Sequence, residues 1–157
     1  MKIKVYYIGK SKKNHHSEDE QLYLKRIKNY RPIELIPLPP LKLSNSLSPL
    51  EIKIKEAAYF ADQIGQNETI VLLDEMGKSF TSKKFALYME QQMNKGLRCL
   101  SFVLGGAYGF SDDFKNKHLQ KIRLSDLTFS HHLARTVLLE QIYRSFTILN
   151  NEPYHNS

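Results

Sequence analysis

A cluster of glycines is the part of this chain whose residue types and spacing best suit the binding of a small molecule. Gly105, Gly106 and Gly109 come directly after the apolar run 102–104. Glycine has no Cβ and accepts positive φ, so a glycine turn at a strand end leaves main-chain amide and carbonyl groups uncovered. These positions alone fit a ligand-binding turn and a tight turn without a ligand equally well.

Other motifs that carry chemistry do not fit the chain. Gly77-Lys78-Ser79 ends like a phosphate-binding loop, but the first glycine of that motif would fall at Leu72. The glycine cluster also lacks the alternating glycine of the dinucleotide fingerprint, so NAD binding is the weaker alternative. The pairs His15-His16 and His131-His132 lack metal-ligand spacing, and the lone Cys99 excludes a zinc site built on several thiolates. We expect no metal.

Arg135 is the charged residue that most needs a partner. On a helix over residues 131–149 it projects near Ile142 and Phe146, where an arginine is costly unless it is paired or reaches a ligand. A structural ion pair and a functional role both remain open.

The elements that must position these residues alternate between strand and helix. Apolar runs predict strands, and patterns such as Ser48-Pro49-Leu50-Glu51 predict helix starts. The alternation predicts an α/β fold with a largely parallel sheet and helices on both faces, in a single domain over residues 1–157. Strands are expected at residues 2–8, 33–38, 69–73, 98–104 and 120–124, and helices after Ser17, after Ser48, at 82–95 and at 131–149.

The last of these helices is apolar around most of its circumference. Leu133, Val137 and Leu138 do not fall on one stripe with Ile142 and Phe146. Such a helix must be buried on more than one side, and in so short a chain a second copy is the natural cover. We therefore expect a homodimer.

The charge of the chain points to a polyanionic partner. Lys and Arg number 23 against 16 Asp and Glu, and residues 1–60 hold 12 of the basic and 6 of the acidic side chains. Clustered Lys and Arg suit phosphate contacts, although a solvated basic surface would look the same. The candidate nucleic-acid face comprises Lys10, Lys12, Lys13, Lys25, Arg26, Lys28 and Arg31.

No apolar stretch approaches the length that spans a bilayer, and the first residues lead into a strand-like run rather than a signal peptide. We expect a cytoplasmic protein with no membrane partner.

Four segments and the C-terminal tail, taken together, resemble one family. They are Ile70-Val-Leu-Leu-Asp74, Phe102-Val-Leu-Gly-Gly-Ala-Tyr-Gly109, Leu124-Ser-Asp-Leu-Thr-Phe-Ser-His131, the segment from Arg135 to Arg144, and Glu152-Pro-Tyr-His155. In this order the chain resembles the SPOUT-class ribosomal RNA large subunit methyltransferase H family, which methylates N3 of a pseudouridine in 23S rRNA.

The resemblance implies a fold and a cofactor that composition does not show. It implies a deep trefoil knot on the C-terminal side and S-adenosylmethionine bound by the knot loops beside a dimer interface. By matching position, the implied cofactor contacts are Leu73, Gly105, Leu124, Ser125, Asp126, Leu127, Thr128 and Phe129.

The resemblance also implies catalytic residues, with 23S rRNA in the large subunit or the assembled ribosome as the substrate. His155 is the first candidate for proton acceptor or substrate contact, since an imidazole titrates near neutrality. Tyr154 is expected to stack on or hydrogen-bond the base, and Arg135 to stabilise imide charge or hold a phosphate. His131 is instead expected to orient the loop.

The chain departs from the family at one position and leaves two other functions open. Ser130 stands where relatives usually have proline, and serine is able to cap the last helix. A Rossmann-type enzyme would bind NAD or ATP instead of S-adenosylmethionine. A non-catalytic RNA- or ribosome-binding α/β protein would have the basic face without affinity for the cofactor.

Overall fold

The computed structural model describes residues 1–9, 17–44 and 46–155 and has an α/β fold. Its centre is a five-stranded sheet of order β2-β1-β4-β3-β5 in which every neighbouring pair of strands is parallel. The sheet expected from the sequence is therefore confirmed. The strands are β1 (Lys2–Ile8), β2 (Ile33–Leu38), β3 (Glu68–Ser79), β4 (Cys99–Leu104) and β5 (Lys121–Arg123).

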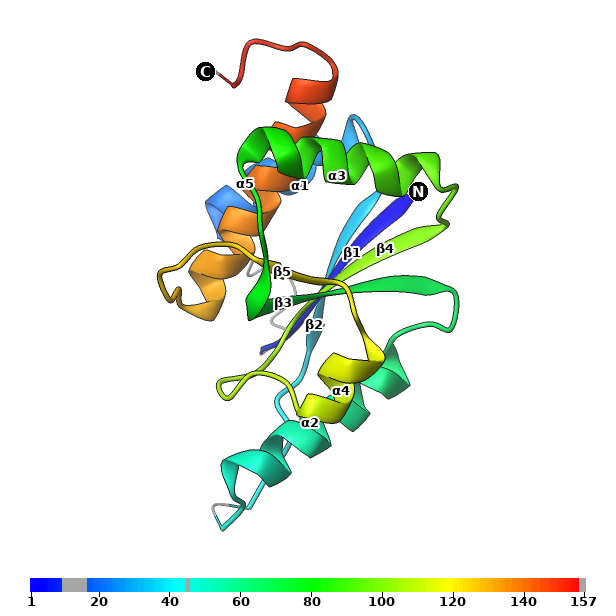
Figure 1. Ribbon diagram of the computed structural model, residues 1–157. Coiled ribbons are helices and arrows are strands. Elements are labelled where there is room, and N and C mark those ends of the chain that lie inside the picture. Colours follow the sequence, from blue (N-terminus) through cyan, green and yellow to red (C-terminus); the bar gives the residue numbers. More distant parts are fainter. Residues whose placement is uncertain (10–16, 45, 156–157) are drawn as a thin grey trace.

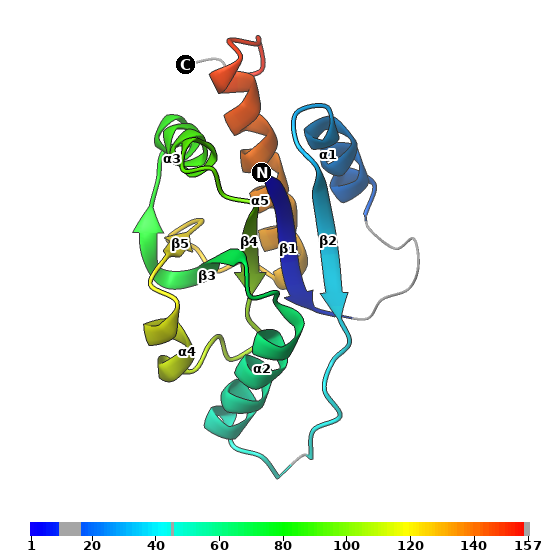
Figure 2. The same cartoon turned by 90° about the vertical axis from the view of Figure 1, so that its right-hand side faces the viewer.

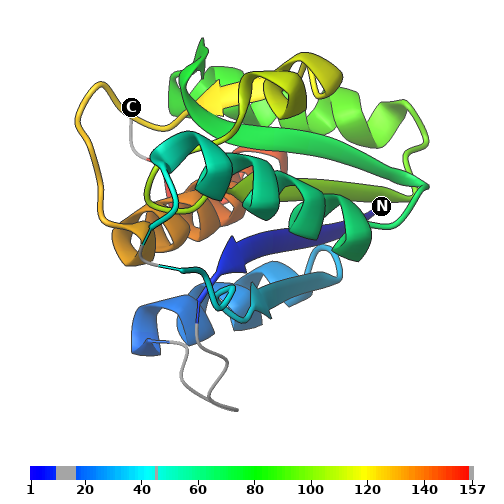
Figure 3. The ribbon, with the colours of Figure 1, turned by 90° about the horizontal axis from the view of Figure 1, so that it is seen from below.

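Helices cover both faces of the sheet, as expected. One face carries α1, α3 and α5, and the other carries α2 and α4 (Figures 1 and 2). Seen from below, α2 lies in front of the strands and α5 behind them (Figure 3). The helices are α1 (Glu18–Lys28), α2 (Pro49–Gln63), α3 (Ser82–Asn94), α4 (Asp112–Lys117) and α5 (His131–Leu149).

The strands bury side chains on both of their faces. Val5 and Phe102 belong to the core beneath α1, α3 and α5, whereas their neighbours Tyr6 and Val103 belong to the core beneath α2 and α4. All the residues of β4 are buried. A parallel sheet covered on both faces has this property, which explains why its strands read as continuous apolar runs.

The helices begin where the capping residues predict. Ser17 and Ser48 each accept a hydrogen bond from the third helical amide, and the acids Glu20 and Glu51 bond back to complete two capping boxes. Helix α4 has no counterpart among the expected elements, because Phe114 is its one buried residue and six residues carry no periodicity.

Strand β3 is longer than expected because it bends around β5. Leu73 and Lys78 of β3 both pair with Ile122 of β5, and the register shifts between them. A Cβ on Gly77 would lie 2.5 Å from the carbonyl carbon of Ile122 and 2.6 Å from its nitrogen, so the bend requires glycine. This pairing extends the strand beyond Asp74, where the local sequence predicts its end.

Helix α5 has the predicted bounds and contributes much of the core. Leu138, Leu139 and Ile142 are fully buried, whereas Leu133 is 46% exposed. Across the described part of the chain, no helix is both long and apolar enough to cross a membrane.

Candidate functional site

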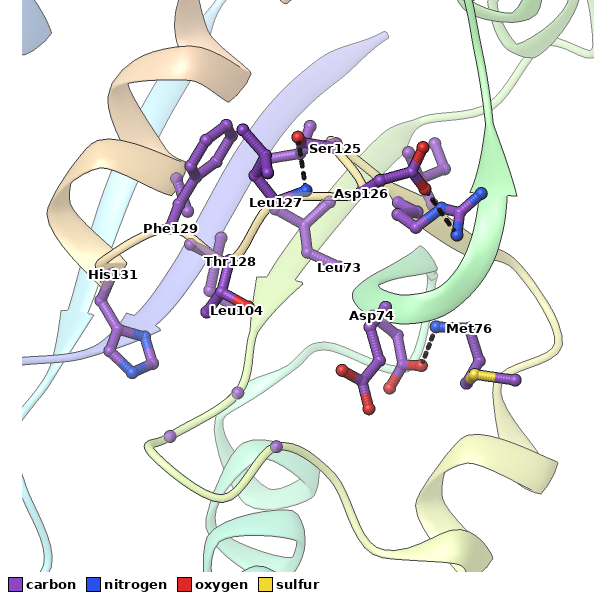
Figure 4. Close-up of a pocket in the computed structure, with 18 residues that line it drawn as sticks. Leu73, Asp74, Met76, Leu104, Ser125, Asp126, Leu127, Thr128, Phe129 and His131 are labelled. Carbon is purple, nitrogen blue, oxygen red and sulfur yellow. Dashed lines mark hydrogen bonds and ion pairs between the residues drawn. The ribbon is translucent and has the colours of Figure 1, made fainter.

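A cavity of about 450 Å³ lies at the carboxyl ends of β4 and β5 and at the bend of β3 (Figure 4). Three segments form it: residues 73–76 at the bend of β3, the glycine turn at residues 105–109, and the segment that joins β5 to α5. All the cofactor contacts that the family resemblance implies line this cavity, namely Leu73, Gly105, Leu124, Ser125, Asp126, Leu127, Thr128 and Phe129. The fold thus brings together residues that are far apart in the sequence.

Main-chain hydrogen bonding closes the glycine turn. The Gly109 amide donates to the Gly106 carbonyl over 2.9 Å, and Gly109 has φ 75°, which favours glycine. A Cβ on Gly105 would lie 3.2 Å from the Gly109 carbonyl carbon, so the two arms of the turn are close. The wall that this turn presents to the cavity is backbone.

The 124–130 loop forms the opposite wall. The Leu127 amide donates to the Ser125 hydroxyl over 2.9 Å, and Arg123 forms an ion pair of 2.8 Å with Asp126. The Ser130 hydroxyl accepts a hydrogen bond of 3.3 Å from the Leu133 amide, so Ser130 caps α5 as predicted. Leu127 is 75% exposed, which leaves apolar surface at the rim.

A buried acid, Asp74, fixes the segment at the bend of β3. Asp74 accepts a hydrogen bond of 2.9 Å from the Met76 amide and forms an ion pair of 2.8 Å with Lys115 of α4. The Asp74 side chain is only 4% exposed. Its place directly after an apolar strand is the sequence signal that could have identified it as a site residue.

Other residues of the cavity are absent from the sequence-based set. They share a position just beyond or beside the carboxyl ends of the strands, which neither composition nor spacing reveals. They are Glu75, Met76, Leu104, Ile122, Arg123 and Ala134. His131, expected to orient the loop, also lines the cavity.

Arg135 lies outside the set that lines the cavity. Its Nε donates a hydrogen bond of 2.8 Å to Glu20, whose side chain is fully buried, and its guanidinium lies 4.0 Å from the centre of the Tyr7 ring. Burial raises the pKa of the Tyr7 hydroxyl, and the positive charge of Arg135 opposes that rise. These contacts correspond to the structural ion pair that the sequence left open.

Tyr154 and His155 lie at the opposite end of α5 from the cavity (Figure 1). The Tyr154 hydroxyl donates to Glu140 over 3.2 Å, and Arg144 Nη1 donates to His155 Nδ1 over 3.2 Å. Burial, reinforced by Tyr23 and Glu140, raises the pKa of the Tyr154 hydroxyl. Because a helix rises about 1.5 Å per residue, Glu140 lies roughly 9 Å along the axis of α5 beyond Ala134, which lines the cavity.

The chemistry of the cavity is that of small-molecule binding. In the described ranges, no three His, Cys, Asp or Glu side chains are grouped as metal ligands would be. Bare backbone, apolar side chains and three acids line the space, with the acids at Asp74, Glu75 and Asp126. Fold and cavity therefore define an α/β protein with a ligand site at the carboxyl ends of its parallel strands.

Comparison with known proteins identifies the family to which this α/β protein belongs. A family model described as "Predicted SPOUT methyltransferase" matches residues 1–155. Proteins named ribosomal RNA large subunit methyltransferase H from Christiangramia forsetii and Parabacteroides distasonis are 41% and 42% identical over 156 residues, which is 99% of this chain and of each relative. The chain belongs to the SPOUT methyltransferase family, in its ribosomal RNA large subunit methyltransferase H group.

A solved structure shares the fold at lower similarity. The crystal structure of a methylase family protein from Neisseria gonorrhoeae superposes with a TM-score of 0.51 at 14% identity, covering 99% of this chain and 86% of that one.

Proposed function

We propose that this protein transfers a methyl group from S-adenosylmethionine to N3 of a pseudouridine in 23S rRNA of the large ribosomal subunit. One observation carries the proposal: every cofactor contact that the family resemblance implies lines a single cavity. The names of the relatives support the substrate class. A ribosomal substrate also favours a cytoplasmic location.

The cavity suits this cofactor in size. Its volume of about 450 Å³ is within the usual range for small-molecule sites. Leu73, the Gly105 main chain and residues 124–129 would hold the cofactor. When bound, S-adenosylmethionine would supply an activated methyl group on a sulfonium.

The bend of β3 supports the proposed trefoil knot. Ile122 is paired with Leu73 on one arm of the bend and with Lys78 on the other, so β5 lies inside a curve made by an earlier part of the chain. The close approach of Gly77 to the Ile122 backbone also indicates that β5 lies against the inner side of this curve. A chain that lies within its own loop is the local arrangement that a knot requires.

The position of the tail favours a site shared between two copies of the chain. The Tyr154 and His155 side chains contact Glu140 and Arg144, whereas the cavity reaches α5 at its first turn, through His131 and Ala134. The exposed Leu127 and Leu133 beside the cavity offer apolar surface for a second copy. We infer that a homodimer supplies the cavity from one copy and the tail from the other.

In this dimer the cavity of one copy would hold the cofactor, and the tail of the other copy would contact the substrate base. The N3 proton must leave, and His155 from the partner copy would accept it or contact the base, with Tyr154 stacked on the base. Arg135 remains a proposed site residue, but its contacts with Glu20 and Tyr7 favour a role in holding α5 on α1.

Mixed dimers test this arrangement. Gly109→Val disables the cavity in one copy, and His155→Ala disables the tail in the other. Each homodimer should be inactive, and mixing the two should restore methylation, because the mixed dimer contains one intact site. If mixing restored nothing although both variants folded and exchanged subunits, the shared site would be wrong.

Recognition of the substrate is assigned to the basic residues of the first part of the chain. Lys25, Arg26 and Lys28 belong to α1, and Arg26 lies 5.3 Å from the Tyr143 ring centre. Lys10, Lys12 and Lys13 lie outside the described residues. Because one small domain offers limited surface to an RNA fold, we expect assembled ribosomes to be better substrates than naked rRNA.

Incubation of ribosomes with labelled S-adenosylmethionine, followed by mapping of the modified nucleotide, tests the function as a whole. Label at N3 of one large-subunit pseudouridine is the expected result. Calorimetric titration with NAD, ATP and S-adenosylmethionine distinguishes the Rossmann-type alternative. Ribosome binding without affinity for any of them would identify a non-catalytic binding protein.

A further inference from the structure

Glu56 of α2 lies directly behind the glycine turn. It is not among the residues that line the cavity, yet an added Cβ on Gly106 would lie 2.3 Å from its Oε2 and 2.4 Å from its Oε1. Gly106 itself lines the cavity. The main chain at Gly106 therefore lies between the Glu56 carboxylate and the space in which the cofactor would bind.

The Glu56 side chain is half-buried, and one of its two carboxylate oxygens is buried without a partner in the described parts of the chain. That oxygen is Oε2. Burial raises the pKa of Glu56, while hydrogen bonding from the Gly106 amide acts in the opposite direction. A carboxylate oxygen buried without a partner opposes folding, so its presence here calls for a function.

The contact with the turn supplies that function. Gly106 and Gly109 form the closing bridge of the turn, with the Gly109 amide bonded to the Gly106 carbonyl. A carboxyl group packed against the Gly106 backbone from outside restricts the orientation of the adjoining peptide groups, which form a wall of the cavity. Because α2 is a helix of 15 residues packed on the sheet, the carboxylate is held on a rigid element.

We propose that Glu56 is a positioning residue that sets the conformation of the glycine turn and thereby the affinity for S-adenosylmethionine. The inference rests on the proposed function of the cavity. It assigns to α2, a helix that contributes nothing to the lining of the cavity, a part in cofactor binding.

The structure offers an independent way to displace the carboxylate. Gly106 does not have positive φ, so alanine is compatible with its backbone. The three nearest atoms to an added Cβ all belong to the Glu56 carboxyl group. Gly106→Ala should therefore act by pushing that group away, and should add little once Glu56 has been replaced.

Titration calorimetry with S-adenosylmethionine tests the proposal on the folded full-length protein. Glu56→Ala should weaken binding about tenfold, the scale of one hydrogen bond to a charged group. Glu56→Gln keeps an acceptor oxygen and should stay within about threefold of wild type. Asp62→Ala, which removes an exposed acid from the same helix, is the matched control and should leave the affinity unchanged.

Gly106→Ala and the double variant complete the test. Gly106→Ala should weaken binding about as much as Glu56→Ala, and the double variant should be little worse than either. Additive losses, or a Glu56→Ala affinity within twofold of wild type, would overturn the proposal. NMR adds a readout that a merely stabilising residue would not move. The chemical shift of the Gly106 amide proton should change in Glu56→Ala and should return to the wild-type value in Glu56→Gln.

The two hypotheses fail differently in this experiment. If the wild-type protein binds no S-adenosylmethionine, the proposed function of the cavity is wrong. If the wild type binds and the Glu56 variants bind equally well, only the positioning role is wrong.

Discussion

Replacing Arg135 with methionine should destabilise the fold far more than a surface substitution does. The change removes the ion pair of 2.8 Å between Arg135 and Glu20, whose side chain is fully buried, and it removes the guanidinium that lies 4.0 Å from the Tyr7 ring centre. Breaking a buried ion pair from one side costs about 3–5 kcal/mol. For a chain of this size that loss lowers the melting temperature by roughly 10 °C.

Urea unfolding at a fixed protein concentration measures the effect. The control is Arg98→Met, which removes an exposed arginine and should change the unfolding free energy by less than about 0.5 kcal/mol. The double variant Arg135→Met with Glu20→Gln should be more stable than the sum of the single changes predicts, by roughly 1–3 kcal/mol, because Glu20→Gln removes the buried charge with which Arg135 pairs.

The result that would refute this reasoning is specific. If Arg135→Met unfolded like wild type but lost methylation, the ion pair with Glu20 would be energetically unimportant and Arg135 would act on the substrate. Zero coupling in the double variant would likewise show that the two side chains stabilise the fold independently.

Three further changes test other parts of the structure. Gly109→Ala forces a side chain onto φ 75° and should destabilise by about 1–2 kcal/mol while weakening cofactor binding in calorimetry; unchanged affinity would contradict the assigned turn. Gly77→Ala places a Cβ 2.5 Å from the Ile122 backbone and should sharply reduce the yield of folded protein, as gel filtration would show; a normal yield would mean that the bend adapts. Burial and Glu152 raise the pKa of Tyr30 to about 12, so the folded state holds this proton more tightly than the unfolded state. Stability should fall as the pH rises from about 10 to about 12, and Tyr30→Phe should flatten that slope in urea unfolding.

The sequence predicts most of the strands and helices well because the patterns that identify them involve residues close together in the chain. The apolar run of β4 and the capping box at Ser48 identify elements without reference to the rest of the chain. The glycine turn at residues 105–109 stands out locally, but its meeting with Leu73 followed only from the family resemblance, since no local pattern says that two segments about 30 residues apart meet. Parallel strands impose that meeting by ending at the same edge of the sheet.

Other features depend on contacts that no local pattern encodes. Lys115 pairs with Asp74 across some 40 residues, and Glu56 meets Gly106 across 50, although each looks like an ordinary charged helix residue in the sequence. The extension of β3 past Asp74 arises only because β5 is there to pair with it. Arg135 was recognised as needing a partner, but its partner Glu20 lies on another helix and could not be named.

The curve of β3 around Ile122 also constrains how the cavity comes into being. Leu73 and Lys78 leave the ribosome long before Ile122, so during synthesis the two arms of the curve have nothing between them. The wall at Leu73 and the segment that joins β5 to α5 can be completed only when β5 takes its place inside the curve. Cofactor binding is therefore a property that the nascent chain acquires last, and a cofactor present during refolding should favour the final arrangement alone.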